Sequence, residues 1–197
     1  MAKILQSLNK TLVAGLVLLI VILIIVGAVS GKTIQFNSVW WSFLFRYLHI
    51  GSGVMWIGLL WYFNFVQIPS MPKIPDEQKP AVSKVIAPTA LFWFRWAALS
   101  TVITGLIVAS LQGYLGAALS LQSGYVAIGI GMWLALDMAF NVWFIIWPNQ
   151  KKALGIVPCE AEPKARAARV AMLTSRINTL LSVPMLYMMA AQSHGGL

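Results

Sequence analysis

Arg46 and His49 lie inside an apolar run, residues 40–67, that also contains Gly53 and Trp56. Ionisable side chains at membrane depth are costly unless they are paired, solvated or bound to something. A neutral imidazole can supply a ligand nitrogen to iron, and glycine leaves room for a macrocycle. His49 is therefore a candidate metal ligand in a haem site, and Arg46 is a candidate partner for a haem propionate.

The same two residues also fit a structural role. His49 can hydrogen-bond a neighbouring helix, and Arg46 can extend its cation towards the nearby membrane interface. His194 is the other histidine of the chain and follows the last apolar run. We therefore do not expect two histidines of this chain to ligate one iron.

A later apolar run carries Trp133, Asp137 and Asn141 at the spacing i, i+4, i+8, which places them on one helical face. A carboxylate near mid-membrane needs a cation, a proton or a hydrogen-bond donor. Arg95 and Arg176, on two other runs, are the candidate partners. The group predicts either a structural clamp between helices or a proton or substrate relay.

The composition indicates which elements position these residues. Hydrophobic residues make up 59% of the 197-residue chain and charged residues 10%, far from the usage of soluble domains. Five apolar runs are long enough to cross a bilayer. They are residues 11–30, 40–67, 88–112, 124–147 and 173–192, with boundaries uncertain by a few residues. We expect an all-α integral membrane protein, a bundle of about five helices forming a single domain over residues 1–197.

Basic residues between the runs indicate the orientation, because they favour the cytoplasmic side. They gather in the N-terminal tail, after the second run and after the fourth run (Lys3 and Lys10; Lys73, Lys79 and Lys84; Lys151, Lys152, Lys164, Arg166 and Arg169). The pattern predicts a cytoplasmic N-terminus and a periplasmic C-terminus. The alanine- and arginine-rich segment 160–172 is expected to run as a helix into the fifth span.

The second run has one polar and small-residue stripe at about 100° per residue. Its members are Arg46, His49, Gly53, Trp56, Ile57, Leu60 and Asn64. Such a stripe should face protein or a cofactor rather than lipid.

Several function classes are excluded or disfavoured. The single cysteine, Cys159, excludes an internal disulfide, and without C-x-x-C-H this sequence cannot attach a c-type haem. The net charge of +9 does not indicate nucleic-acid binding, since the basic residues flank apolar runs. No phosphate-binding loop, dinucleotide fingerprint or zinc protease motif occurs.

The runs RYLHIGSGVMWIGLLWYFNFVQ, ALFWFRW, NVWFIIWPNQ and RINTLLSVPMLYMMAA together resemble the N-terminal membrane domain of the bacterial urate hydroxylase (urate oxidase N-terminal) family. The resemblance implies a multi-pass protein of the bacterial inner membrane. The positions that it marks for functional or structural weight are Arg46, His49, Trp56, Asn64, Asn141, Trp143 and Asn149.

Full-length members of that family join this region to a C-terminal cytochrome c domain, so the resemblance implies electron delivery to that haem. Because this sequence has no C-x-x-C-H, it is expected to be a short form whose acceptor is a separate cytochrome c.

Three functions remain open. The first is a redox-linked membrane protein that binds haem b through His49 and serves a cytochrome c. The second is a non-catalytic subunit packed against a larger respiratory or oxygenase complex. The third is a small transporter lined by Asp137, Arg95 and Arg176. The expected partners are membrane lipid and either other membrane subunits or a cytochrome c, with no nucleic acid.

Overall fold

The computed structural model describes residues 2–196 and divides the chain into two compact units, Met1–Trp41 and Ser42–Leu197. The described residues form helices and no strand, which confirms the all-α prediction. The single domain over residues 1–197 stays a prediction.

The first unit contains α1 (Ala2–Leu5) and α2 (Leu8–Ser30). The helix α2 has no buried residue and is apolar on every side, as expected for a helix surrounded by lipid. It ends at Gly31, whose φ of 65° is the left-handed conformation that glycine adopts at helix ends.

The second unit contains the remaining helices, three of which include a π-helical turn. Their bounds are α3 (Ser38–Trp61, which begins in the first unit), η1 (Tyr62–Gln67), α4 (Ile68–Ser70), η2 (Met71–Lys73), η3 (Ala81–Ile86), α5 (Ala87–Leu111), α6 (Leu115–Leu119), α7 (Val126–Phe140), η4 (Asn141–Ile146), α8 (Trp147–Ala153) and α9 (Ala161–His194). The expected helix over 160–172 is confirmed, because α9 runs without a break through it.

Four continuous helical segments among the described residues are long and apolar enough to cross a membrane: Leu8–Ser30, Ser38–Lys73, Ala81–Leu111 and Val126–Ala153. They correspond to the first four expected spans. The helix α9 is not among them, because hydroxyl and amide groups, together with Arg176, interrupt its apolar sequence. The fifth span and the orientation of the chain stay predictions.

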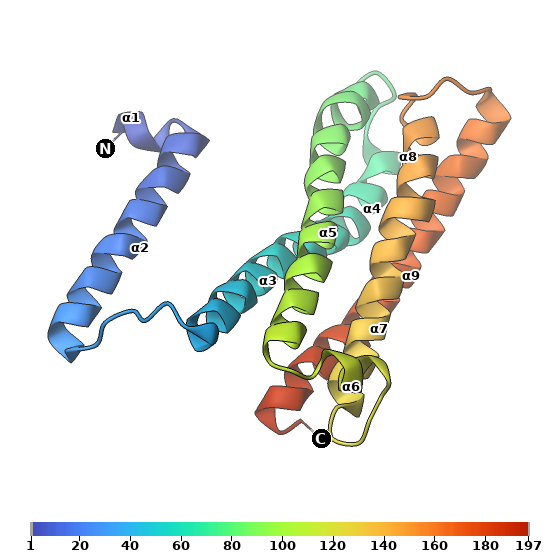
Figure 1. The fold of residues 1–197 in the computed structure, drawn as a ribbon. Helices are drawn as coiled ribbons and strands as arrows, with labels where there is room; N and C mark the ends of the chain where they lie inside the picture. The colour runs from blue at the N-terminus through green and yellow to red at the C-terminus, as the bar shows by residue number, and fades with distance from the viewer. Residues whose placement is uncertain (1, 197) are drawn as a thin grey trace. The chain divides into compact units, whose positions relative to one another are not determined.

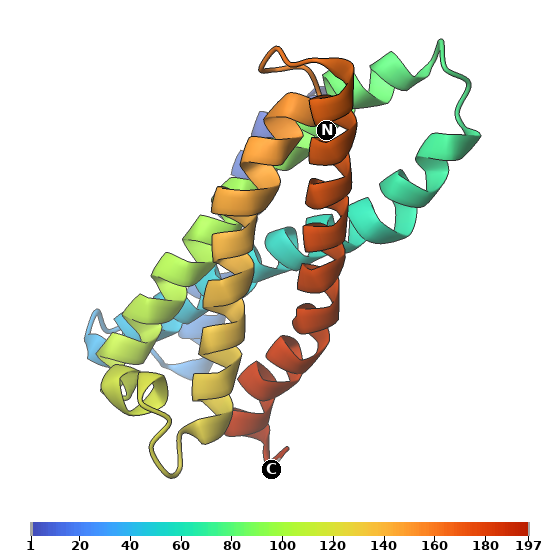
Figure 2. The same cartoon turned by 90° about the vertical axis from the view of Figure 1, so that its right-hand side faces the viewer.

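The core of the second unit lies where α3, α5 and the α7–η4 segment meet. Its fully buried side chains include Trp56, Leu60, Phe94, Met138 and Val142. The helix α9 packs along α7 and α8, as Figures 1 and 2 show. The two helices run antiparallel, so that Gln192 near the end of α9 accepts a hydrogen bond from the Ile128 amide near the start of α7.

Gly129 allows α6 to pack closely against α7. A Cβ atom at this position would collide with the Ala118 carbonyl oxygen and would lie 2.7 Å from Cδ2 of Leu121. A collision with backbone cannot be relieved by a side-chain rotation.

We therefore expect Gly129→Ala to destabilise the protein by about 1–3 kcal/mol, the usual cost of overpacking. The matched control is Gly116→Ala, where a Cβ atom meets nothing within 4 Å and alanine favours the helix. Thermal unfolding in detergent measures both. Equal unfolding midpoints for the two variants would contradict the close packing of α6 on α7.

Candidate functional site

His49 is held in one orientation by the neighbouring helix. Its Nδ1 atom lies 2.9 Å from the backbone carbonyl oxygen of Thr101 on α5. A carbonyl oxygen can only accept, so Nδ1 carries the proton and donates it. In the neutral ring this leaves the lone pair on Nε2, which makes no hydrogen bond within residues 2–196. The arrangement is the one that histidine ligands of metals use to fix their tautomer.

Gly105 makes room for this imidazole. A Cβ atom at Gly105 would lie 2.8 Å from Cε1 and 3.0 Å from Nδ1 of His49. Gly53, the glycine expected to leave room for a macrocycle, faces Thr101, whose Cγ2 atom would lie 3.8 Å from an added Cβ, and its role in a cofactor site stays a prediction. The spacing of Thr101, Thr104 and Gly105 at i, i+3 and i+4 was the available signal for a small-residue face on the third span.

Arg46 lies one turn before His49, nearer the start of α3, and its side chain is exposed. Its positive charge reaches Tyr114, in the turn between α5 and α6. Burial raises the pKa of the Tyr114 phenol, and the charge of Arg46 opposes that rise. The phenol rings of Tyr114 and Tyr125 are stacked with centroids 5.8 Å apart. Arg46 therefore lies near the turn between α5 and α6, and both of its expected roles stay predictions.

Trp56 is a core residue. Only 1% of it is exposed, and its indole Nε1 has no hydrogen-bond acceptor among the described residues. The predicted stripe on this span thus turns progressively inward, from the exposed Arg46 through the half-buried His49 to the buried Trp56.

A cavity of about 380 Å³ lies between α3 and α5 beside the residues that flank His49. It is open to the surface, and its lining residues are Tyr47, Leu48, Gly51, Ser52, Ser100 and Thr104. This cavity thus lies between the two helices that position the imidazole, and His49 does not line it.

Some polar residues of α9 are buried and are paired across helices. Asn178 is fully buried, accepts a hydrogen bond of 2.9 Å from the Asn141 amide, and donates one of 2.9 Å to the Met138 carbonyl. Ser175 accepts a hydrogen bond of 2.8 Å from Asn64. Amides and hydroxyls buried at membrane depth need such partners.

The structure separates the ionisable residues that the sequence grouped together. Asp137 on α7 and Arg176 on α9 are both exposed, whereas Arg95 is only 9% exposed and stacks on Trp147, 3.3 Å from the ring centroid. None of the three belongs to an ion pair within the described part of the chain. Asn141 is buried, whereas Asp137 one turn before it is exposed.

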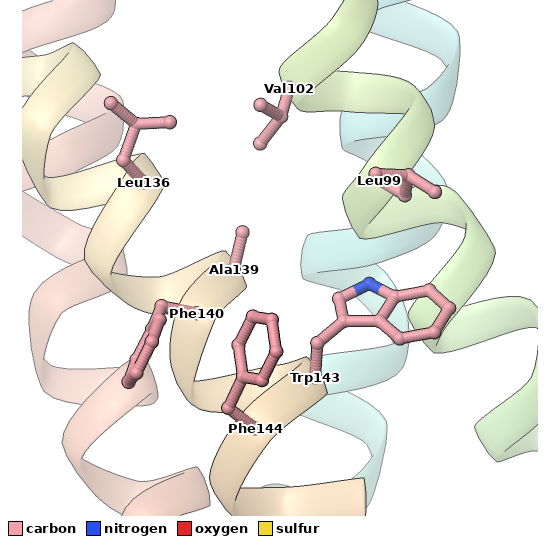
Figure 3. Close-up of a pocket in the computed structure, with 7 residues that line it drawn as sticks. All are labelled: Leu99, Val102, Leu136, Ala139, Phe140, Trp143 and Phe144. Carbon is pink, nitrogen blue, oxygen red and sulfur yellow. The ribbon is translucent and has the colours of Figure 1, made fainter.

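An open apolar groove of about 370 Å³ lies between α5 and α7 (Figure 3). It is lined by Leu99, Val102, Leu136, Ala139, Phe140, Trp143 and Phe144. The indole Nε1 of Trp143 has no acceptor among residues 2–196, and its ring packs edge to face with Trp96 at 5.5 Å. Asn149 bonds only the Ile145 carbonyl of its own helix, at 2.8 Å.

No group of three metal-ligating side chains occurs among the residues that the structure describes.

Residues 117–196 match the family model described as urate oxidase N-terminal. The match covers about two-fifths of the chain, from α6 through α9, and includes Asp137, Asn141 and the buried Asn178. It confirms the expected resemblance for this part of the sequence. No curated protein and no solved structure matches the chain.

We expect Asn178→Ala to lower the free energy of unfolding by about 1–3 kcal/mol, because it removes the bond to the Met138 carbonyl and leaves the Asn141 side-chain amide buried without its acceptor. Thermal unfolding in detergent measures the change. Asn149→Ala is the control, since it removes a hydrogen bond within one helix at a half-buried position. A control that is as destabilised as Asn178→Ala would contradict the importance of the interhelical network.

Proposed function

We propose that the chain is a redox-linked membrane protein of the urate hydroxylase type, in which His49 binds a haem b that serves a separate cytochrome c. The observation that carries the proposal is the hydrogen bond from His49 Nδ1 to the Thr101 carbonyl, which leaves Nε2 for a metal. The urate oxidase N-terminal match over residues 117–196 supports the class of protein.

The residues around His49 fit one axial ligand of a haem. Gly105 lets the ring lie close to α5, and Arg46 is one turn away, where its guanidinium can pair with a propionate. When bound, a haem b supplies one-electron transfer. His194 is not expected to bind the same iron, because it follows the last apolar run.

The residues of this chain have separate tasks in this proposal. The Thr101 carbonyl fixes the tautomer of the imidazole, and the Thr101 hydroxyl bonds the Ala97 carbonyl at 2.7 Å and so adds no competing donor to the ring. His49 and Arg46 lie in the part of α3 that the distribution of basic residues assigns to the periplasmic half. A periplasmic cytochrome c would approach this end, and urate is the first substrate to test with that acceptor.

We expect the purified protein to show a b-type Soret band, and His49→Ala to retain at most about a tenth of the bound haem, as ligand losses of this kind commonly do. His194→Ala is the matched control and should retain the haem. Pyridine haemochrome spectra normalised to protein measure the content. A colourless wild-type protein, or full haem content in His49→Ala, would contradict the proposal.

A second candidate is a non-catalytic subunit of a larger membrane complex. The exposure of Asp137 and Arg176 favours it, because a charge facing lipid near mid-membrane costs roughly 3 kcal/mol. A neighbouring subunit that covers Asp137 and Arg176 and places side chains of opposite charge against them would remove that cost.

Under this second candidate, we expect the wild-type protein to leave the membrane in mild detergent as an assembly larger than one chain. Asp137→Arg should dissociate it, because the partner would then meet a like charge. Asp76→Arg, at an exposed loop position, should leave the size unchanged. Native gels and light scattering measure the size, and a monomeric wild-type protein would exclude this candidate.

A further inference from the structure

We propose that Arg95, Trp147 and Lys151 form a phosphate-binding site at the cytoplasmic end of the second unit. We call these three residues the Arg95 site. The depth of the site in the membrane favours the headgroup phosphate of a phospholipid as the ligand, and a soluble phosphate would use the same chemistry.

Arg95 is a buried cation without an acceptor. Its side chain offers five N–H donors, and it makes neither a hydrogen bond nor an ion pair within residues 2–196. Its Nη1 atom is fully covered and unpaired, and the residue is only 9% exposed. A desolvated guanidinium in this state is costly unless an anion or another acceptor meets its free edge.

Trp147 and Lys151 shape the surroundings of this guanidinium. The guanidinium carbon of Arg95 lies 3.3 Å from the centroid of the Trp147 ring, and this cation–π contact holds the group in place without using its N–H donors. Lys151 is one turn beyond Trp147 on α8, with Nζ 5.6 Å from the same ring. Two cations therefore share one aromatic ring.

No carboxylate of residues 2–196 pairs with either of these two cations. The chain has five acidic residues, and all are exposed: Asp76, Glu77, Asp137, Glu160 and Glu162. Within the described residues the one ion pair joins Asp76 to Lys79, in the loop between η2 and η3. The missing negative charge at the Arg95 site must therefore come from outside the chain.

The lengths of α5 and α7–α8 place the site at the depth of lipid phosphates. About 20 helical residues cross the hydrocarbon, so a count back from Leu111 reaches Phe92, and a count forward from Val126 reaches Ile145. Arg95 then lies one turn inside the boundary, and Trp147 lies just outside it. Since the guanidinium stacks on Trp147, its charge is at the boundary, with Lys151 one turn further towards the headgroups.

Phosphate is the anion that best fits this arrangement. A planar guanidinium binds two phosphate oxygens at once, and a lysine adds a mobile point charge. Basic pockets between helices on the cytoplasmic side bind anionic headgroups for the same reasons. A carboxylate carried by a partner protein is the competing acceptor, and the experiment separates the two.

The test uses the full-length protein, delipidated in detergent and titrated in two arms. One arm adds phosphatidylglycerol and counts the lipids retained in native mass spectra; the other adds inorganic phosphate and follows the unfolding midpoint. We expect one tightly retained lipid on the wild-type protein, loss of its retention in Arg95→Gln, and about fivefold weaker retention in Lys151→Gln. Lys152→Gln, at the exposed neighbouring position, should match the wild type.

Each outcome bears on the proposal. Stabilisation by inorganic phosphate that Arg95→Gln abolishes would support the site and assign it a soluble ligand. If Arg95→Gln does not fold, the comparison of Lys151→Gln with Lys152→Gln decides. Equal lipid retention by these two lysine variants, or no binding of either ligand to the wild type, would overturn the proposal.

Discussion

The second unit depends on one constraint: polar groups at membrane depth have no water and must find partners within the protein. The buried Asn178 illustrates it, because this one side chain joins α9 to both Asn141 and the Met138 carbonyl of the neighbouring helix. The hydrogen bond from His49 to the Thr101 carbonyl likewise pairs a polar group of α3 with one of α5. Its consequence is chemical as well as structural, since it determines which imidazole nitrogen is free.

The charged groups that have no partner among the described residues indicate where the chain meets other molecules. Arg95 is buried against Trp147 without an acceptor, and Asp137 is exposed on a helix that is otherwise apolar enough to lie in lipid. Each leaves a charge that the described residues do not neutralise. We propose that an external phosphate neutralises Arg95 and that a neighbouring subunit covers Asp137. Both differ from the internal clamp or relay between Asp137 and Arg95 that the sequence suggested.

The sequence predicted the helical class and the first four long segments, because apolar length is a property of consecutive residues. It also predicted that the stripe through Trp56 and Leu60 faces protein. It could not predict the pairing of His49 with Gly105, because this contact depends on how α3 crosses α5 (Figure 1). Nor could periodicity show that Asn141 is buried while Asp137, one turn earlier, is exposed, because this depends on how closely α9 packs at each level.

We propose that Nε2 of His49 ligates a haem iron, and resonance Raman spectra of the ferrous protein can test this ligation with natural histidine and with ¹⁵N-labelled histidine. In a five-coordinate ferrous haem we expect an iron–histidine stretching band that moves to lower frequency with the label and is absent from His49→Ala. A five-coordinate ferrous haem without a label-sensitive band, or the same band in His49→Ala, would contradict the proposal.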